Sequence, residues 1–141
     1  MAVQVYLAVD IGASSGRLVA GEFDGTRISL EEVYRFNNGG VSVGRYVHWD
    51  VLEQWSHIKR ALQQAVDRYG NTITSVGVDT WGVDFGLLGP NDELLANPIH
   101  YRDNHTEGMM EYAFQQVSRS EIFNQSGLQF MRFNTLYQLL A

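Results

Sequence analysis

The chain has 141 residues, of which 45% are hydrophobic and 18% are charged, so it has the composition of one globular domain rather than a disordered segment. The 10 Lys and Arg residues stand against 16 Asp and Glu residues, and the net charge of -6 argues against nucleic acid as the main partner. The absence of cysteine excludes disulfide bonds and thiolate metal sites. The N-terminus has no basic leader and no apolar run has transmembrane length, which favours a cytoplasmic protein.

The first predicted element is a strand over residues 3–9, where apolar side chains alternate with others and the run ends at Asp10. The small residues of a turn follow it: Gly12, Ala13, Ser14, Ser15 and Gly16. Such a turn lets backbone N–H groups and hydroxyls converge on a phosphate chain. Because Asp10 would repel that phosphate, we expect a divalent cation between them, with Mg²⁺ as the best candidate. The stretch therefore predicts a nucleotide and metal site.

Two common phosphate-binding motifs are excluded by the composition of this turn. A P-loop needs Gly-Lys-Ser/Thr, and the only lysine in the chain is Lys59. The dinucleotide fingerprint needs three glycines that lead into a helix, whereas residues 17–23 have the pattern of a second strand. The turn is therefore predicted to close a hairpin. An ordinary glycine-rich hairpin without a ligand is the alternative.

A third antiparallel strand is predicted over residues 28–36. The dipeptide Asp24-Gly25 supplies the tight turn before it, and apolar side chains recur at its even positions, with Glu32 as the one charged exception. The segment 37–44 is rich in Asn and Gly and is predicted to be a flexible connection that leads to a short apolar stretch. The chain is therefore expected to open with three meandering strands.

The next predicted element is a helix that begins after Asp50 and ends at Gly70. Asp50 has the side chain of an N-cap, and Glu53 is placed to complete a capping box. The apolar stripe that identifies the helix consists of Val51, Trp55, Ile58, Leu62, Val66 and Tyr69. We expect Trp55 in the core and His57 on a solvated face.

Residues 73–79 are apolar and β-branched, which predicts a buried strand that runs parallel to the first because a helix separates the two. A further strand is predicted over residues 83–88, followed by a turn over residues 89–92. The connection between these strands lies at the strand end where α/β folds bind ligands.

This connection carries the features of a sugar site. Trp81 offers a flat apolar face and Gly82 exposes its backbone. Asp79 and Asp84 are able to accept hydrogen bonds from hydroxyl groups. We therefore expect a small polar ligand such as a sugar at Trp81, Gly82 and Asp84.

Helical patterns run over residues 109–117 and 121–124, with Met109 and Met110 expected in the core and Gly127 as the stop. A last helix begins near residue 134 and stays apolar to the end of the chain without a cap. This interrupted helix predicts that the chain is a piece of a longer polypeptide. Its uncovered side chains near Leu136 predict that the piece could associate with itself.

Several of these runs resemble one family of enzymes. The strand, the Asp-x-Gly turn and the second strand resemble the first phosphate loop of the actin-like, ribonuclease H-like ATPase superfamily. Within it, the chain resembles the N-terminal part of the FGGY carbohydrate kinases over nearly its whole length. The matching runs are residues 9–17, 35–39, 78–85, 101–103 and 133–139. Residues 80–85 and 133–139 are the most specific of them.

The resemblance implies an α/β fold with a mixed sheet, in the sugar-binding first domain of a kinase whose second, ATP-clasping domain lies outside residues 1–141. It implies Mg²⁺-dependent transfer of the γ-phosphoryl group of ATP to the 1-hydroxyl of L-rhamnulose. By the same resemblance Asp10 would serve the metal and Gly82 would contact the ketose through its backbone. The residues that would contact ATP are Ala13, Ser14, Ser15, Gly16 and Arg17.

The catalytic base of the family is an aspartate in a His-Asp-Thr motif, which this chain lacks. The dipeptide His105-Thr106 is not that motif, because Asn104 precedes it and Glu107 follows it. The resemblance therefore implies no catalytic residue within this chain, and the 141 residues alone are expected to be inactive.

Some residues keep a plainer alternative. Arg17 either anchors phosphate or pairs with a surface carboxylate, and Asp84 either binds a sugar hydroxyl or satisfies nearby backbone N–H groups. Arg102 and Asp103 either line the ketose cleft or form a local ion pair. The four histidines lack the spacing of a metal site and are expected to have ordinary polar roles: His48, His57, His100 and His105.

For the whole protein, two alternatives remain open. One is an FGGY kinase that acts on a fuculose-like or xylulose-like ketose. The other is a non-catalytic, actin-like nucleotide-binding module, although an assembling module would have no use for Trp81, Gly82 and flanking carboxylates in a ligand-facing turn.

Overall fold

The computed structural model describes residues 3–141, which divide into two compact units. The sheet unit comprises residues 3–39 and 50–82, and the helical unit comprises residues 40–49 and 83–141. Across the described residues, no helix combines the length and the apolar character that crossing a membrane requires.

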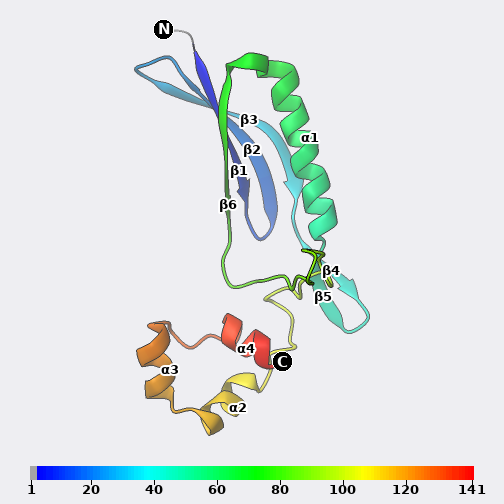
Figure 1. Ribbon diagram of the computed structural model, residues 1–141, viewed down its shortest axis with the longest axis vertical. Helices are drawn as coiled ribbons and strands as arrows, with labels where there is room; N and C mark the ends of the chain where they lie inside the picture. Colours follow the sequence, from blue (N-terminus) through cyan, green and yellow to red (C-terminus); the bar gives the residue numbers. More distant parts are fainter. Residues whose placement is uncertain (1–2) are drawn as a thin grey trace. The chain divides into compact units, whose positions relative to one another are not determined.

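The sheet unit has strands ordered β3-β2-β1-β6. Its elements are β1 Gln4–Ile11, β2 Ser15–Phe23, β3 Ile28–Asn37, α1 Val51–Tyr69, a 3-10 turn Gly70–Thr72 and β6 Ile73–Thr80. The pairs β1–β2 and β2–β3 are antiparallel, whereas β1–β6 is parallel. Figure 1 shows α1 lying along one face of this sheet. The predicted α/β order, three antiparallel strands followed by a helix and a parallel strand, is confirmed.

The core of the sheet unit lies between α1 and the face of the sheet that α1 covers. Alternate residues of β1 point toward the helix, as the period of two requires, while residues between them such as Tyr6 remain exposed. Two alanines of α1, Ala61 and Ala65, let the helix approach the sheet closely. The buried apolar residues of this cluster are Val5, Leu7, Val9, Ile11, Leu18, Ala20, Ala61 and Ala65.

A β-bulge in β3 explains why Glu32 did not fit the predicted alternation. Leu18 pairs with Tyr34 and Val19 pairs with Glu32, so Val33 is an extra residue without a partner in the ladder. The slip moves each side chain beyond it to the other face of the sheet. Leu30 is therefore 75% exposed, and the prediction that it lies on the apolar face is wrong.

The helix α1 has the predicted limits, and its N-cap is confirmed because the N–H of Glu53 donates to the Asp50 side chain at 2.9 Å. The buried stripe, however, is rotated from the predicted one. Trp55 is 54% exposed rather than in the core, because Ala61 and Ala65 define the face that meets the sheet. His57 is not solvated as predicted, because its ring stacks on Phe36 with centroids 4.6 Å apart.

The strand β6 is parallel to β1 as predicted, but it is not buried. It lies at the edge of the sheet, and its side chains Val76 and Val78 are 52% and 68% exposed. Its β-branched composition correctly predicted a strand but not its burial, since an edge strand has a neighbour on one side only.

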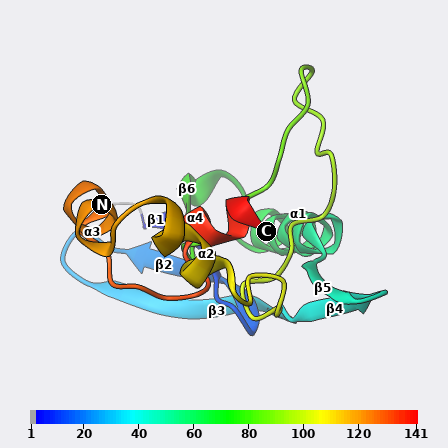
Figure 2. The ribbon, with the colours of Figure 1, turned by 90° about the horizontal axis from the view of Figure 1, so that it is seen from below.

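The helical unit begins with a hairpin of β4 Gly40–Val43 and β5 Tyr46–Trp49. Its helices are α2 Met109–Gln116, α3 Arg119–Ser126 and α4 Thr135–Leu140. Figure 2 shows α2 and α4 side by side. The three predicted helices are confirmed, as is Gly127, which ends α3 with a φ of 65°.

Two predictions for the helical unit are wrong. Residues 40–43 form a strand rather than a flexible connection, because they pair with residues 46–49. Residues 83–88 do not form a strand, because Val83 has a φ of 76° that interrupts an extended run. The predicted turn after them is present, since the N–H of Asp92 donates to the carbonyl of Gly89 at 3.1 Å.

Candidate functional site

The predicted phosphate loop is the connection between β1 and β2, and it is a tight turn. The N–H of Gly12 donates to the carbonyl of Ser15 at 2.9 Å, and β2 begins at Ser15. Gly16 is required here because a Cβ at that position would lie 2.1 Å from a ring carbon of Phe36. The loop is therefore shaped by its own sequence and by the ring packed beneath it.

A buried asparagine that the sequence analysis missed supports the loop from the residue directly after β3. Asn38 is 3% exposed and donates through Nδ2 to the Gly12 carbonyl at 2.7 Å, while its backbone N–H donates to the Ser14 carbonyl at 3.0 Å. Its Oδ1 accepts a hydrogen bond from Gln54 of α1 at 2.8 Å. The segment 37–44 was predicted to be flexible, and its composition carried no signal that one asparagine is buried.

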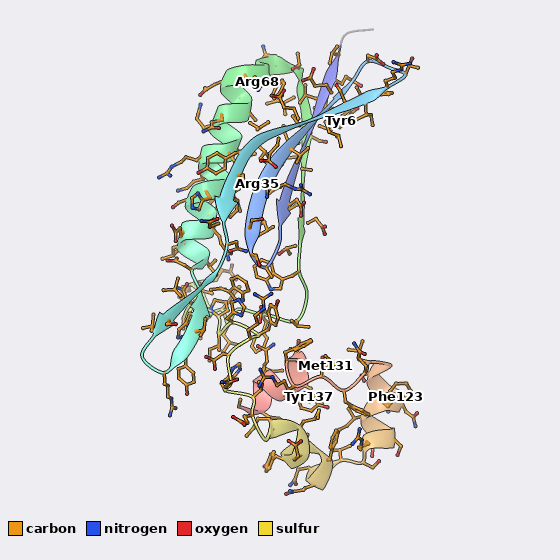
Figure 3. All side chains as sticks on the ribbon, turned by 180° about the vertical axis from the view of Figure 1, so that it is seen from behind. Tyr6, Arg35, Arg68, Phe123, Met131 and Tyr137 are labelled. Atoms are coloured by element: carbon orange, nitrogen blue, oxygen red, sulfur yellow. The ribbon has the colours of Figure 1, made fainter. Side chains whose placement is uncertain are left out.

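A row of charged residues crosses the sheet beside this loop. Arg35 is in register with Arg17, Arg17 with Asp10, and Asp10 with Asp79, so all four lie on the sheet face opposite α1. Arg17 donates to Asp10 Oδ2 through Nε at 2.8 Å and through Nη2 at 2.7 Å. Of the two alternatives for Arg17, the ion pair with a carboxylate is present. The carboxylate is that of Asp10, which is also the proposed metal ligand. Figure 3 shows Arg35 on this sheet.

The carboxylates at this end of the sheet are too few to enclose a magnesium ion by themselves. Within residues 3–141, no group of three or more His, Cys, Asp or Glu side chains is placed to hold a metal ion. Magnesium in phosphate-binding sites takes one or two carboxylates and completes its shell with phosphate oxygens and water. Asp10 Oδ1 is not engaged by Arg17, and Asp79 is the residue in register with Asp10. The donor set therefore fits a metal held together with phosphate, not one held by the protein alone.

The predicted ketose turn follows β6 directly. β1 and β6 are parallel neighbours, and Ile11 pairs with Thr80. The phosphate loop and the turn that contains Gly82 therefore leave the sheet at the same edge, from two strands that lie about 4.8 Å apart. Gly82 is exposed, and a Cβ added to it would meet no atom within 4 Å. Trp81 is half-buried and packs against the core of the sheet unit. The backbone at Gly82 is thus open to a ligand.

Asp84 lies in the helical unit, where its carboxylate meets an aromatic side chain. Its Oδ2 accepts a hydrogen bond from the indole Nε1 of Trp49 at 2.6 Å. Trp49 is buried and stacks on His100 with ring centroids 3.9 Å apart. Asp84 therefore anchors the helical unit, and its role toward a sugar stays a prediction.

Asp103 is a structural carboxylate in the helical unit. It is 6% exposed and accepts hydrogen bonds from the backbone N–H groups of Val47 and His105, both at 2.7 Å. Burial raises the pKa of Asp103, but these hydrogen bonds outweigh it and leave the pKa below its usual value. Arg102 lies over the Tyr101 ring, 5.0 Å from its centroid, rather than in an ion pair with Asp103.

The histidines of the helical unit have polar and packing roles. His48 Nδ1 lies 3.0 Å from the carbonyl of Asn97. His100 is 3% exposed and its Nδ1 accepts the N–H of Arg102 at 3.0 Å. Burial lowers the pKa of His100 below its ordinary value, so the ring is neutral near pH 7.

The sequence relatives of the chain are carbohydrate kinases. Residues 5–140 match the N-terminal domain of the FGGY family of carbohydrate kinases. The chain is 46% identical over 138 residues to a rhamnulokinase of Oceanobacillus iheyensis and 46% identical over 136 residues to a rhamnulokinase of Bacteroides thetaiotaomicron. These matches cover 98% and 96% of this chain but 29% and 28% of the relatives. The chain thus spans less than a third of the length of the curated relatives that it matches.

Solved structures share the fold at low sequence identity. A gluconate kinase from Lactobacillus acidophilus superposes with a TM-score of 0.82 at 16% identity, over 99% of this chain and 28% of that protein. A ligand-bound xylulose kinase from the same organism gives 0.81 at 16% identity, over 97% of this chain and 28% of that protein. The fold is therefore that of the sugar kinases, with their actin-like mixed sheet. Together with the match over residues 5–140, this establishes that the chain belongs to the FGGY family of carbohydrate kinases.

Proposed function

We propose that these residues form the N-terminal part of the sugar-binding domain of a kinase that transfers the γ-phosphoryl group of ATP to the 1-hydroxyl of L-rhamnulose. The observation that carries the proposal is the adjacency of two turns, since the phosphate loop and the backbone at Gly82 follow paired ends of β1 and β6. Phosphoryl transfer needs a phosphate and a hydroxyl held in line. L-rhamnulose is proposed as the substrate because the relatives at 46% identity are rhamnulokinases.

Each residue of the site has a proposed task. The turn residues that would hold the phosphates of ATP are Ala13, Ser14, Ser15, Gly16 and Arg17. Asp10 would hold Mg²⁺, which when bound neutralises the charge that develops on the phosphoryl oxygens. The Gly82 backbone would hold the ketose so that its 1-hydroxyl points at the phosphate loop. The hydroxyl oxygen forms the new bond to phosphorus, the bond to the ADP oxygen breaks, and the hydroxyl proton passes to a base outside residues 1–141.

The proposal is tested with the full-length protein that carries these residues. ATP consumption is measured with L-rhamnulose, L-fuculose, D-xylulose and gluconate. We expect kcat/KM for L-rhamnulose to exceed the others by about 10²-fold or more, because a site built to hydrogen-bond the hydroxyls of one substrate discriminates strongly against others. A higher value for another ketose would transfer the proposal to that ketose. No turnover with any sugar would defeat it.

A further inference from the structure

The backbone at Val83 has an uncommon conformation. Its φ is 76°, in the left-handed region that a β-branched residue rarely enters. Such a residue persists there only when surrounding contacts hold it, and such positions cluster at ligand-binding sites. Val83 is also the residue directly after Gly82, with which it shares a peptide unit.

Two side chains of α4 hold this conformation. Thr135 donates through Oγ1 to the Val83 carbonyl at 2.9 Å, and Gln138 donates through Nε2 to the same oxygen at 3.1 Å. The Gln138 amide also donates to the carbonyl of Phe133 at 2.8 Å. Because both of its partners are carbonyl oxygens, the nitrogen of this amide must face them. Gln138 is 9% exposed, so its geometry is fixed by packing as well.

The helix that carries this clamp is itself anchored. Tyr137, labelled on α4 in Figure 3, is 1% exposed and meets the Phe114 ring edge-on, with centroids 6.4 Å apart. At the start of α4, Asn134 donates through Nδ2 to the carbonyl of Gln129 at 2.8 Å. The Val83 carbonyl is therefore held in place by a helix that packs into the interior of the helical unit.

We propose that Gln138 and Thr135 are positioning residues for the ketose. By fixing the Val83 carbonyl they hold the left-handed turn, and the turn sets the direction in which the Gly82–Val83 peptide presents its N–H. The Gly82 side of this peptide is open, since an added Cβ would meet no atom within 4 Å. This inference rests on the proposed function, in which the Gly82 backbone contacts the sugar, and it adds the residues that aim that backbone.

The test uses Gln138→Met and Thr135→Val in the full-length protein, with Gln116→Met as the matched control because Gln116 is exposed at the end of α2. We expect Gln138→Met to raise the KM for the ketose about tenfold, the factor that loss of one hydrogen bond typically produces. The KM for ATP should stay within about twofold of the wild-type value, as it should for both substrates in the control. Thr135→Val, which leaves the Gln138 contact in place, should raise the ketose KM by a smaller factor.

A second substitution separates positioning from folding. Glycine adopts positive φ without strain, so Val83→Gly added to Gln138→Met should recover most of the lost ketose affinity. An unchanged ketose KM in Gln138→Met, an equal rise in both KM values, or no recovery with glycine would overturn the proposal. Should Gln138→Met fail to fold, Thr135→Val carries the same test at an exposed position.

The inference and the proposed function fail in different ways. If the wild-type protein turns over no sugar, the proposed function is lost. If the wild-type protein is active and the clamp variants bind the ketose normally, only the clamp is lost. Crystal structures of the wild type and Gln138→Met provide a readout without activity, and a left-handed Val83 in both would also overturn the clamp.

Discussion

The turn at residues 12–16 and the turn at residues 82–84 both present backbone to a proposed ligand, yet they are held differently. The first is closed by its own hydrogen bond, by the pairing of β1 with β2, and by Asn38 at the end of the next strand. The second has no strand after it and depends on side chains 52 and 55 residues later in the chain. The conformation of a turn between paired strands can be predicted from the local sequence, whereas that of a turn held by a distant helix cannot.

The difference suggests how each turn responds to change. The first turn is crowded, because Gly16 leaves no room for a Cβ above Phe36. The second is open at Gly82 and strained at Val83. Substitutions in the first should therefore damage the fold, and substitutions in the second should damage ligand binding while the fold survives.

The largest expected effect is that of Asp10→Asn. The substitution removes the carboxylate charge proposed for Mg²⁺ and the partner of Arg17, so we expect kcat in the full-length protein to fall by about 10²-fold or more. Raising the magnesium concentration should recover part of the loss. Glu107→Gln, at an exposed position in the helical unit, is the control. A kcat close to wild type in Asp10→Asn would contradict the metal role.

Gly16→Ala compared with Gly82→Ala tests the contrast between crowded and open turns directly. The Cβ at position 16 would overlap the Phe36 ring, so we expect a loss of stability of about 1–3 kcal/mol, measured by chemical denaturation. The Cβ at position 82 meets nothing, so stability should be retained while the ketose KM rises. Equal stability losses at the two positions would remove the distinction.

Asn38→Leu should produce the reverse of the Gln138→Met pattern. It removes the hydrogen bond to the Gly12 carbonyl and leaves that acceptor and Gln54 without their partner. We expect the KM for ATP to rise about tenfold with little change for the ketose, because one buried hydrogen bond is lost. The neighbouring exposed Asn37 gives the control, Asn37→Leu. A larger effect on the ketose than on ATP would show that Asn38 does not serve the phosphate loop.

The smallest expected effect is a pH dependence confined to the helical unit. Burial lowers the pKa of His100, so its contribution to stability is complete above the unfolded pKa of about 6.5 and is lost as the pH falls toward the folded value. Protonation would also turn Nδ1 from an acceptor of the Arg102 N–H into a donor. Asp84 and Asp103 favour the protonated ring and so limit the loss.

The measurement for His100 is the fall in melting temperature between about pH 7 and about pH 5.5. We expect a smaller fall in His100→Gln, since glutamine keeps an acceptor but does not titrate. Identical pH profiles for the two proteins would exclude His100 as the source.

Local patterns predicted most of the sheet unit correctly and failed where tertiary contacts decide. The period of two in β1, the Asp50 cap and, in the helical unit, the Gly127 stop are short-range signals, and all three are confirmed. The bulge at Val33 was missed because one extra residue reverses the faces of a strand without changing its composition. Trp55 was misplaced because the small side chain of Ala61, not the large aromatic one, allows close helix packing.

The candidate site shows the same division. Asp10, Gly12 and Gly16 could be named from sequence because a phosphate loop is encoded in consecutive residues. Asn38 could not, because polar composition near a strand end predicts exposure, and only the structure shows it to be 3% exposed. Gln138 could not either, since its partner at Val83 lies 55 residues away.

The bulge in β3 also affects how the two edges of the sheet meet other chains. On β3, the extra residue Val33 breaks the even spacing of unpaired backbone donors and acceptors that a foreign strand would need for addition. On β6, the register shifts near the start of the strand, where Thr74 is the extra residue, and pairing with β1 is regular from Ser75 to Thr80. The irregularity thus divides β3 in its middle but leaves most of β6 evenly spaced, so the β6 edge is the more receptive of the two to an added strand.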